Sequence, residues 1–518
     1  MTGPTPAAAA DAEESTAELA RGGRTSFAGF VLRLLARMPF LFIAGRLYGS
    51  AELGRFGYAI LVVELTAQLA TIGLRRGMAD ALAREAAQPA TGAPPANTVA
   101  DALFLSLVLA AVGAALLIAV PTLVFPNGVA SPVDRLFPLV AIAPALIEIS
   151  LAALAFRHDI VAQVRARAIV EPWTLSLAAW PALHLVGARQ GLLVSYALSM
   201  AASAATALWP CWRSYGRPRR WRPHTGRMWR MAADNIPRAG ADLADWGSRR
   251  LDFFILGRFA SPEVTGIYFV AQNMASMAAK LKNSFDSIIA PLLATAIAEG
   301  DRAQVAAHVR QVAFWVLTAQ FAVVLSLGST SRASLGLFGP TFPSGAAVFV
   351  LLLLVELFSS QGAVCEDALV YLKPRTNLAI AFAGVVLQAV LTLVFVPAYG
   401  PYAAAGGLAA AVFVVSLVKS AVLRRVVGAG VSGWRPALIP AALGGFAVGV
   451  AVLHSPEVVA PALHAAGLGP NRSRAVAEAL VLTVGQVAIL SSFGTLIWTI
   501  GFTPADKVLF QLRKARRT

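Results

Sequence analysis

The 518-residue sequence has little of what a soluble enzyme or a disulfide-stabilised secreted protein needs. It has two cysteines, Cys211 and Cys365, with no CxxC spacing and no histidine cluster beside them, so neither a disulfide framework nor a metal site is indicated. Only 14% of the residues are charged, whereas 57% are hydrophobic and the mean hydropathy is +0.68. This composition lies far outside the soluble range and predicts an all-α polytopic membrane protein without a cofactor.

Long polar loops are missing as well. Apolar runs of roughly 18 to 25 residues, the length that crosses a bilayer as a helix, recur along the whole chain. We count fourteen, at residues 27–48, 55–73, 101–125, 134–156, 169–187, 190–210, 234–257, 264–290, 304–328, 342–371, 376–397, 401–423, 435–454 and 475–502. Charges interrupt the first, seventh and eighth runs. The longest predicted outside loop runs only from His454 to Arg474, so there is no room for a soluble catalytic domain, and we expect a non-enzyme that acts within the membrane.

Positive charge is abundant and unevenly placed. The formal net charge is +16, and most Lys and Arg fall in alternate segments between the runs, which places both termini in the cytoplasm by the positive-inside rule. Seven Arg lie between Cys211 and Arg230. We interpret this segment as a topology anchor that contacts membrane lipids, not as a nucleic-acid site. Residues 1–24 are Ala-rich and acidic without an apolar core, and predict a disordered cytoplasmic tail.

An internal repeat organises the chain. A shift of 212 residues places Arg37–Ala59 over Arg249–Ala271 without a gap, with seven identities in 23 positions. Because six spans separate the two copies, both run the same way through the membrane, which predicts a parallel pseudo-twofold repeat of two six-helix lobes. The expected segments are a tail (1–24), an N-lobe of helices 1–6 (25–210), an Arg-rich cytoplasmic linker (211–232), a C-lobe of helices 7–12 (233–425), two added helices (426–502) and a basic tail (503–518).

Charged residues within the predicted spans concentrate in helices 1, 7 and 8. At about 100° per residue, six of them share one face of helix 7, namely Asp234, Arg238, Asp242, Asp245, Arg249 and Asp252. Helix 7 also carries Arg250, helix 1 carries Arg33 and Arg37, and helix 8 carries Lys280, Lys282 and Asp286. Since charges in spans are costly, we expect these side chains to face protein or water, in a cavity between the lobes.

Three interpretations of the charged face stay open. Opposite charges can pair between the lobes as a gate, Arg can bind an anionic substrate directly, or the charges can be tolerated as helix ends. Pairs four residues apart, such as Asp245 with Arg249, can also neutralise one another. Arg grips phosphate oxygens with two parallel hydrogen bonds, which suits a lipid diphosphate head group.

Four acids stand alone in other spans, namely Glu64, Glu148, Glu171 and Glu356. Such a carboxylate can titrate near neutral pH and couple transport to protons, or it can hydrogen-bond a neighbouring helix.

Several stretches resemble the Wzx-type oligosaccharide flippases of the polysaccharide transporter family, part of the multidrug, oligosaccharidyl-lipid and polysaccharide (MOP) exporter superfamily. They are IAGRLYGSAELGRFGYAI, QLATIGLRRGMADALARE, RRLDFFILGRFASPEVTGIYFVAQNM, IIAPLLATAIAEGD, LFGPTFPSGAAVFVLLLLVE and LVFVPAYGPYAAAGGLAAA, over residues 27–425. The resemblance implies the MOP flippase fold. It also implies a function, which is to move a polyprenyl-diphosphate-linked oligosaccharide across the bacterial cytoplasmic membrane for surface polysaccharide or lipopolysaccharide synthesis. Glycosyltransferases and a polysaccharide polymerase are the implied partners.

The resemblance also implies roles for the charged residues. They are substrate contact for Arg33, Arg37, Arg249 and Arg250, and gating or coupling for Asp242, Asp245 and Asp252. The pattern of charges in the spans adds Lys280 as a substrate-binding candidate and Arg238 and Glu64 as gating or coupling candidates. Fourteen spans also occur in lipid II flippases of the superfamily, and a drug or cation antiporter would share the fold. A membrane glycan polymerase or ligase is the enzyme alternative, although it would need a larger outside loop.

Overall fold

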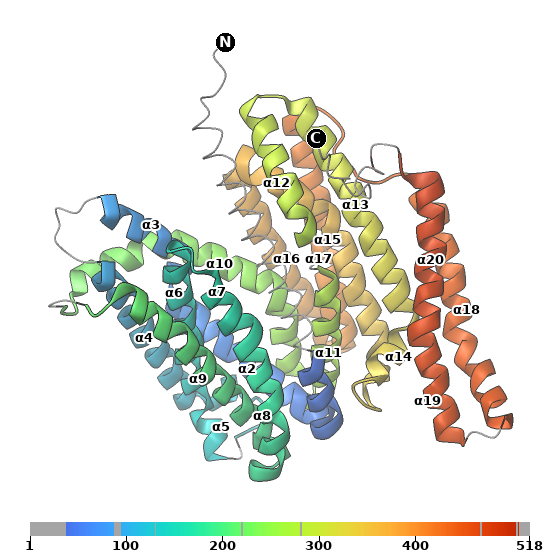
Figure 1. Ribbon diagram of the computed structural model, residues 1–518, viewed down its shortest axis with the longest axis horizontal. Helices are drawn as coiled ribbons and strands as arrows, with labels where there is room; N and C mark the ends of the chain where they lie inside the picture. Colours follow the sequence, from blue (N-terminus) through green and yellow to red (C-terminus); the bar gives the residue numbers. More distant parts are fainter. Residues whose placement is uncertain are drawn as a thin grey trace, which may run out of the picture. The chain divides into compact units, whose positions relative to one another are not determined.

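The computed structural model describes residues 38–87, 95–129, 131–218, 221–279, 282–466, 469–503 and 506 (Figure 1). The described part of the chain is 89% helical and contains no strand. Ten described helices are long and apolar enough to cross a membrane. The predicted fold class, a polytopic all-α membrane protein, is therefore confirmed.

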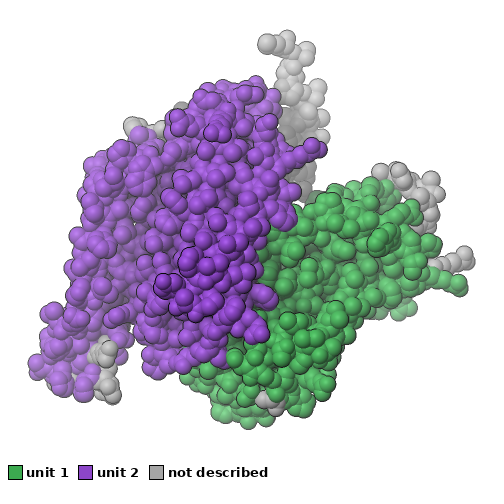
Figure 2. Space-filling model, turned by 180° about the vertical axis from the view of Figure 1, so that it is seen from behind, with its two compact units in different colours: residues 1–247 green, residues 248–518 purple. Residues whose placement is uncertain are grey.

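The chain divides into two compact units, residues 1–247 and 248–518, which Figure 2 colours separately. Unit 1 contains the helices η1 (Ala44–Tyr48), α2 (Gly49–Thr71), α3 (Leu74–Ala87), α4 (Pro95–Ala119), η3 (Pro121–Leu123), α5 (Pro132–Leu136), η4 (Phe137–Ala141), α6 (Ile142–Phe156), α7 (Ile160–Gln163), η5 (Val164–Val170), α8 (Glu171–Val186) and α9 (Ala188–Tyr215). The helix α10 (Thr225–Phe259) begins in unit 1 and ends in unit 2. Within unit 1, α2, α4, α6 and α9 pack on one another, and α8 packs on α9.

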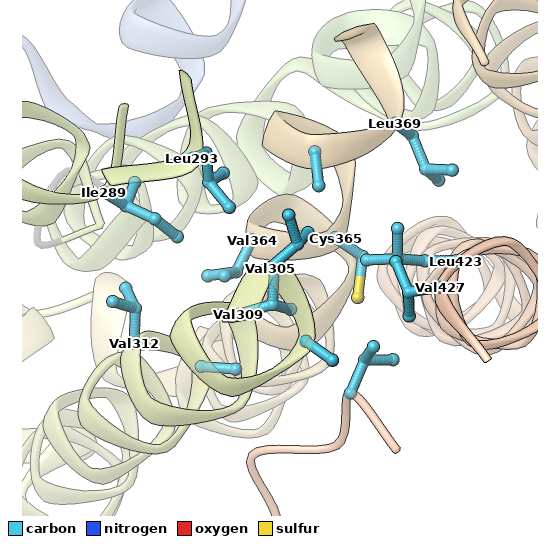
Figure 3. Close-up of a cluster of buried hydrophobic side chains, with 14 of the residues drawn as sticks. Ile289, Leu293, Val305, Val309, Val312, Val364, Cys365, Leu369, Leu423 and Val427 are labelled. Atoms are coloured by element: carbon cyan, nitrogen blue, oxygen red, sulfur yellow. The ribbon is translucent and has the colours of Figure 1, made fainter. Parts of the chain in front are cut away.

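Unit 2 contains the helices α11 (Pro262–Ala279), α12 (Asn283–Ala298), α13 (Arg302–Ser329), α14 (Ser331–Gly336), η6 (Phe342–Gly345), α15 (Ala346–Leu372), α16 (Pro374–Tyr399), α17 (Pro401–Val427), α18 (Leu438–Ala465), α19 (Pro470–Leu480), η7 (Val481–Gly485), α20 (Gln486–Leu496) and η8 (Ile497–Gly501). A buried hydrophobic cluster joins α12, α13, α15 and α17 around Cys365 (Figure 3). Cys365 and Cys211 are both buried free thiols.

The predicted span 264–290 falls on α11, described as far as Ala279, and on α12, which begins at Asn283; residues 280 and 281 between them lie outside the described residues. The helix α10 begins at Thr225, nine residues before the predicted start at Asp234, because the polar residues before the apolar run continue the same helix. Helix assignment from hydropathy alone misses this extension, since hydropathy locates apolar windows and not backbone hydrogen bonding.

The aligned repeat segments adopt the same local structure in their own units. In unit 1 the turn falls at Gly49, whose φ of +83° breaks the helical path between η1 and α2. The aligned position in unit 2 is Ser261, between the end of α10 at Phe259 and the start of α11 at Pro262. Both copies therefore form a helix, a tight turn and a second helix at matching positions.

The added helices α18 and α20 pack on each other and on α13 in unit 2. One buried carboxylate, that of Asp506, fixes the end of this region. It accepts hydrogen bonds from Arg435 Nη1 at 2.6 Å, Trp315 Nε1 at 3.0 Å and the Thr503 backbone N–H at 2.9 Å. Burial raises the pKa of this carboxyl, but the hydrogen bonds from Arg435 and Thr503 outweigh burial and hold the pKa at about 2.

Candidate functional site

The structure covers most of the predicted site residues. Arg33, Arg37 and Lys280 lie outside the described residues, so their roles stay predictions. Arg238, Asp242 and Asp245 lie on the part of α10 that belongs to unit 1. Arg249, Arg250 and Asp252 lie on the part that belongs to unit 2, and Glu64 lies on α2. The charged face of α10 therefore divides into two groups, each with neighbours in its own unit.

The unit 1 group pairs with α3. Asp242 is 2% exposed, and its Oδ1 lies 3.1 Å from Arg75 Nη2 and 2.5 Å from Arg76 Nε. Two further pairs extend the contact along the same two helices, namely Arg238 with Asp80 and Asp234 with Arg84. We call these three sets of ion pairs the α3–α10 clasp. Because both helices belong to unit 1 here, the clasp is an arrangement within this unit.

Backbone geometry directs α3 onto α10. The helix α2 ends at Thr71; its C-cap Ile72 is a β-branched residue with a φ of +45°, and Gly73 follows with a φ of +75°. A Cβ on Gly73 would lie 2.5 Å from the backbone nitrogen of Ala239, and one on Gly77 would lie 1.8 Å from Asn235 Oδ1. Two glycines one helical turn apart therefore allow the close approach that brings the charges of α3 to α10.

Sequence reasoning missed the α3 side of the clasp. It counted Arg75, Arg76 and Arg84 only as positive charge in an inside loop, and it compared the charges of helix 7 with those of helices 1 and 8. A signal was present, because Arg76, Asp80 and Arg84 are spaced by four residues and so share one face of a helix. Hydropathy does not reveal this charged helix face, since the segment is too polar to be identified as a membrane span.

The unit 2 group centres on Asp252, which is fully buried. Its Oδ2 accepts a hydrogen bond from the hydroxyl of Tyr268 and another from Gln272 Nε2 at 3.0 Å. Tyr268 and Gln272 lie one turn apart on α11. Phe253 stacks on the Tyr268 ring at a centroid distance of 6.1 Å and holds it in place. We call Asp252, Tyr268 and Gln272 the Asp252 triad.

Charged groups surround the triad. Arg250 attracts the Asp252 carboxylate, and Arg249 attracts the carboxylate of Glu356 on α15. Sequence reasoning identified Glu356 only as an isolated acid, whereas the fold brings it near one of the predicted substrate-binding arginines. Arg249 and Arg250 thus each lie near a carboxylate of the same unit.

The other isolated acids fall into two kinds. Glu148 on α6 and Glu171 on α8 both pair with Arg167, which lies in the π-helix η5. The sequence pattern did not single out Arg167. Because Arg167 pairs with both Glu148 and Glu171, these two acids act as hydrogen-bond partners of a neighbouring segment, the second of the two roles expected for isolated acids. Among the described residues, no hydrogen bond or ion pair joins the Glu64 side chain to another residue, so its coupling role stays a prediction.

Further ion pairs tie the helices of unit 2 together. Lys282 Nζ lies 3.0 Å from Asp367 Oδ1, and Lys419 Nζ lies 2.7 Å from Glu366 Oε2. The described residues include no group of three His, Cys, Asp or Glu that could hold a metal ion. The polar chemistry of the described part is therefore that of ion pairs and hydrogen bonds.

Comparison with solved structures identifies the fold. The chain resembles the lipid II flippase MurJ in an inward closed conformation, with a TM-score of 0.65 and 13% identity over 92% of this chain and 98% of that one. It resembles an inward-facing multidrug resistance MATE family transporter of the MOP superfamily, with a TM-score of 0.62 and 14% identity over 77% of this chain and 94% of that one. An outward-facing MATE family transporter gives a TM-score of 0.51 and 15% identity over 77% and 93%.

No protein-family profile matches the sequence, and no curated protein matches it. At 13–15% identity, these likenesses to a flippase and two transporters show that the chain shares their fold.

Proposed function

We propose that the protein flips a polyprenyl-diphosphate-linked oligosaccharide from the inner to the outer leaflet of the bacterial cytoplasmic membrane by alternating access. The product would serve the synthesis of a surface polysaccharide such as O-antigen, capsule or exopolysaccharide. One observation carries most weight. The likeness to a flippase for a lipid-linked substrate covers 92% of the chain, whereas the likeness to the drug transporter covers 77%.

The charge on α10 supports an anionic head group. Arg249 and Arg250 lie together on its unit 2 part, and Arg binds diphosphate oxygens in a bidentate manner that Lys cannot reproduce. Glu356 and Asp252 lie near these arginines, so an arriving diphosphate would compete with carboxylates for the same guanidinium groups. Such an exchange of partners would link substrate arrival to a change in the helix contacts of unit 2.

Deletion of the gene tests the proposal. We expect one lipid-linked oligosaccharide to accumulate on the inner face of the membrane, detected by extraction of the lipid-linked intermediates, and the surface glycan to be lost. Accumulation of lipid II would instead identify a lipid II flippase, the activity for which the MurJ structure is named. Normal surface glycan together with increased drug sensitivity would identify a drug antiporter, the alternative that the MATE likeness favours.

Point variants then test the arginines in the deletion strain. Arg249→Ala should abolish complementation with membrane insertion intact, and Arg249→Lys should restore it only in part, because an ammonium cannot form the two parallel hydrogen bonds. The matched control is Arg302→Ala, an exposed arginine at the start of α13, which should complement fully. Full activity of Arg249→Ala would remove this residue from the substrate site.

A further inference from the structure

The carboxyl-terminal ends of α6 and α9 meet in unit 1. Arg157, which follows α6, donates a hydrogen bond from Nη1 to the backbone carbonyl of Ser214 at 2.5 Å. Its guanidinium lies over the Tyr215 ring, 4.2 Å from the centroid, and the Tyr215 hydroxyl donates to the carbonyl of Ala153 at 2.7 Å. An arginine from the loop after α6 is therefore fixed beside the last turn of α9.

Aromatic and basic side chains gather at this end of α9. Trp209 and Trp212 are 64% and 49% exposed, and their rings contact each other edge to face at a centroid distance of 6.1 Å. The guanidinium of Arg217 lies 5.5 Å from the centroid of the Trp212 ring. Arg213 is exposed and lies four residues after Trp209, on the same face of the helix. We call Arg157, Trp209, Trp212, Arg213 and Arg217 the α9 cluster.

The acids closest to the α9 cluster along these segments already have partners. Asp159, two residues after Arg157, accepts a hydrogen bond from the backbone N–H of Ala162 and so caps α7. Asp101 on α4 is fully buried and accepts from Arg227 Nη2 at 2.9 Å and from Trp221 Nε1 at 2.8 Å. The second contact set also ties the segment that follows the cluster to unit 1. The exposed charge of the cluster is therefore positive and is held on one unit.

We propose that the α9 cluster binds the head group of an anionic phospholipid, with phosphatidylglycerol as the model ligand. Exposed tryptophans are typical of the bilayer interface, where the ring meets the acyl region and the N–H meets water. The three arginines then reach the phosphate, which guanidinium groups bind with parallel hydrogen bonds. Their positive charge favours an anionic head group over a zwitterionic one.

This proposal differs from the sequence-based expectation of general lipid contact for the segment between Cys211 and Arg230. It names a cluster that includes Arg157 and Trp209, which lie outside that segment, and it requires selectivity between lipids. The positive-inside rule predicts that this end of α9 faces the cytoplasm, so the ligand would come from the inner leaflet. The inference does not depend on the transport function proposed above.

Native mass spectrometry of the full-length protein in detergent, with equal amounts of phosphatidylglycerol and phosphatidylcholine, tests the selectivity. The wild type should retain phosphatidylglycerol in preference. A basic side chain near an anionic lipid surface is worth about fivefold in affinity. Arg217→Gln should therefore lower the affinity for phosphatidylglycerol about fivefold and the triple variant Arg157→Gln, Arg213→Gln, Arg217→Gln about 100-fold, with phosphatidylcholine binding unchanged.

The matched control removes the same charge elsewhere. Arg302, Arg424 and Arg425 are exposed arginines of unit 2, at the start of α13 and in the last turn of α17. Replacing all three with Gln should leave the affinity for phosphatidylglycerol at the wild-type value. A control variant that loses as much affinity as the α9 triple variant would show an effect of net charge alone and overturn the site.

Other outcomes decide the proposal as well. Equal retention of the two lipids by the wild type, or undiminished selectivity in the triple variant, overturns it. If the triple variant does not fold, Arg217→Gln and Trp212→Ala decide, because each should weaken phosphatidylglycerol binding without removing the Arg157 contact to α9. Polyprenyl diphosphate is the competing ligand. If it displaces phosphatidylglycerol from the wild type at lower concentration, the cluster belongs to a carrier lipid and the phospholipid assignment is overturned.

Discussion

The ion pairs of Asp242 in the α3–α10 clasp allow a quantitative prediction. The Asp242 side chain is 2% exposed, whereas those of its partners Arg75 and Arg76 are 38% and 48% exposed. An exposed pair contributes about 0–1 kcal/mol, and breaking a fully buried pair costs about 3–5 kcal/mol. Since one partner is buried and the others are half-solvated, we expect a coupling energy of about 1–2 kcal/mol between Asp242 and Arg76, between those limits.

A double-mutant cycle measures this coupling. The four proteins are the wild type, Asp242→Asn, Arg76→Gln and the double variant, and Arg75 remains in all of them. Reversible denaturant unfolding in mixed micelles, followed by tryptophan fluorescence, would report the free energy of unfolding of each protein. The coupling energy is the part of the double variant's effect that the two single variants do not account for.

A second pair of the clasp is the matched control. Asp234 and Arg84 join the same two helices at 3.6 Å, but their side chains are 55% and 62% exposed. Their coupling should be below about 0.5 kcal/mol, because water screens both charges. The reasoning is refuted if the coupling of Asp242 with Arg76 does not exceed that of Asp234 with Arg84.

Three other predictions follow from local geometry. Gly77→Ala should lower the thermal unfolding temperature, because the new Cβ would overlap a buried side chain of α10. Gly240→Ala has open space at the new Cβ and should leave the unfolding temperature equal or higher. Thermal scans of the two variants compare these effects. Because the pKa of Asp506 is held at about 2, the contribution of this carboxylate to the free energy of unfolding should be complete above about pH 4 and lost as the pH falls toward 2. Asp506→Asn should lack this part of the pH dependence, which unfolding measured across that pH range would show. Cys211 and Cys365 should resist a maleimide in the folded protein and react on unfolding; fast labelling of native protein would contradict their burial.

The sequence is enough to establish the membrane class, the helical fold and the existence of two copies. Hydropathy indicates the membrane class and the helices, because a helix that crosses a bilayer needs a run of apolar residues of a set length. The 23-residue repeat indicates the two copies, because aligned residues such as Gly45 and Gly257 keep the same spacing in both. In the structure, the turns at Gly49 and Ser261 fall at aligned positions of the two copies.

The partners of the charged residues could not be obtained this way. Helical periodicity placed Asp242 and Asp252 on one face of a helix, but their partners lie 167 and 16 residues away, on α3 and α11. Pairing of that kind depends on where chain segments meet in space, and no local pattern encodes it. Periodicity therefore predicted a single charged stripe, whereas the fold divided it into a clasp of ion pairs and a buried polar triad.

What the sequence determined by itself is the all-helical membrane fold and the presence of charge within helices 1, 7 and 8, because length, hydropathy and period are local properties. What only the tertiary structure decided is which carboxylates meet opposite charges and which meet neutral hydrogen-bond donors. Asp242 meets two guanidinium groups and Asp252 meets a hydroxyl and an amide. The difference arises because burial removes water from both carboxylates, and the residues that replace the water come from distant parts of the chain.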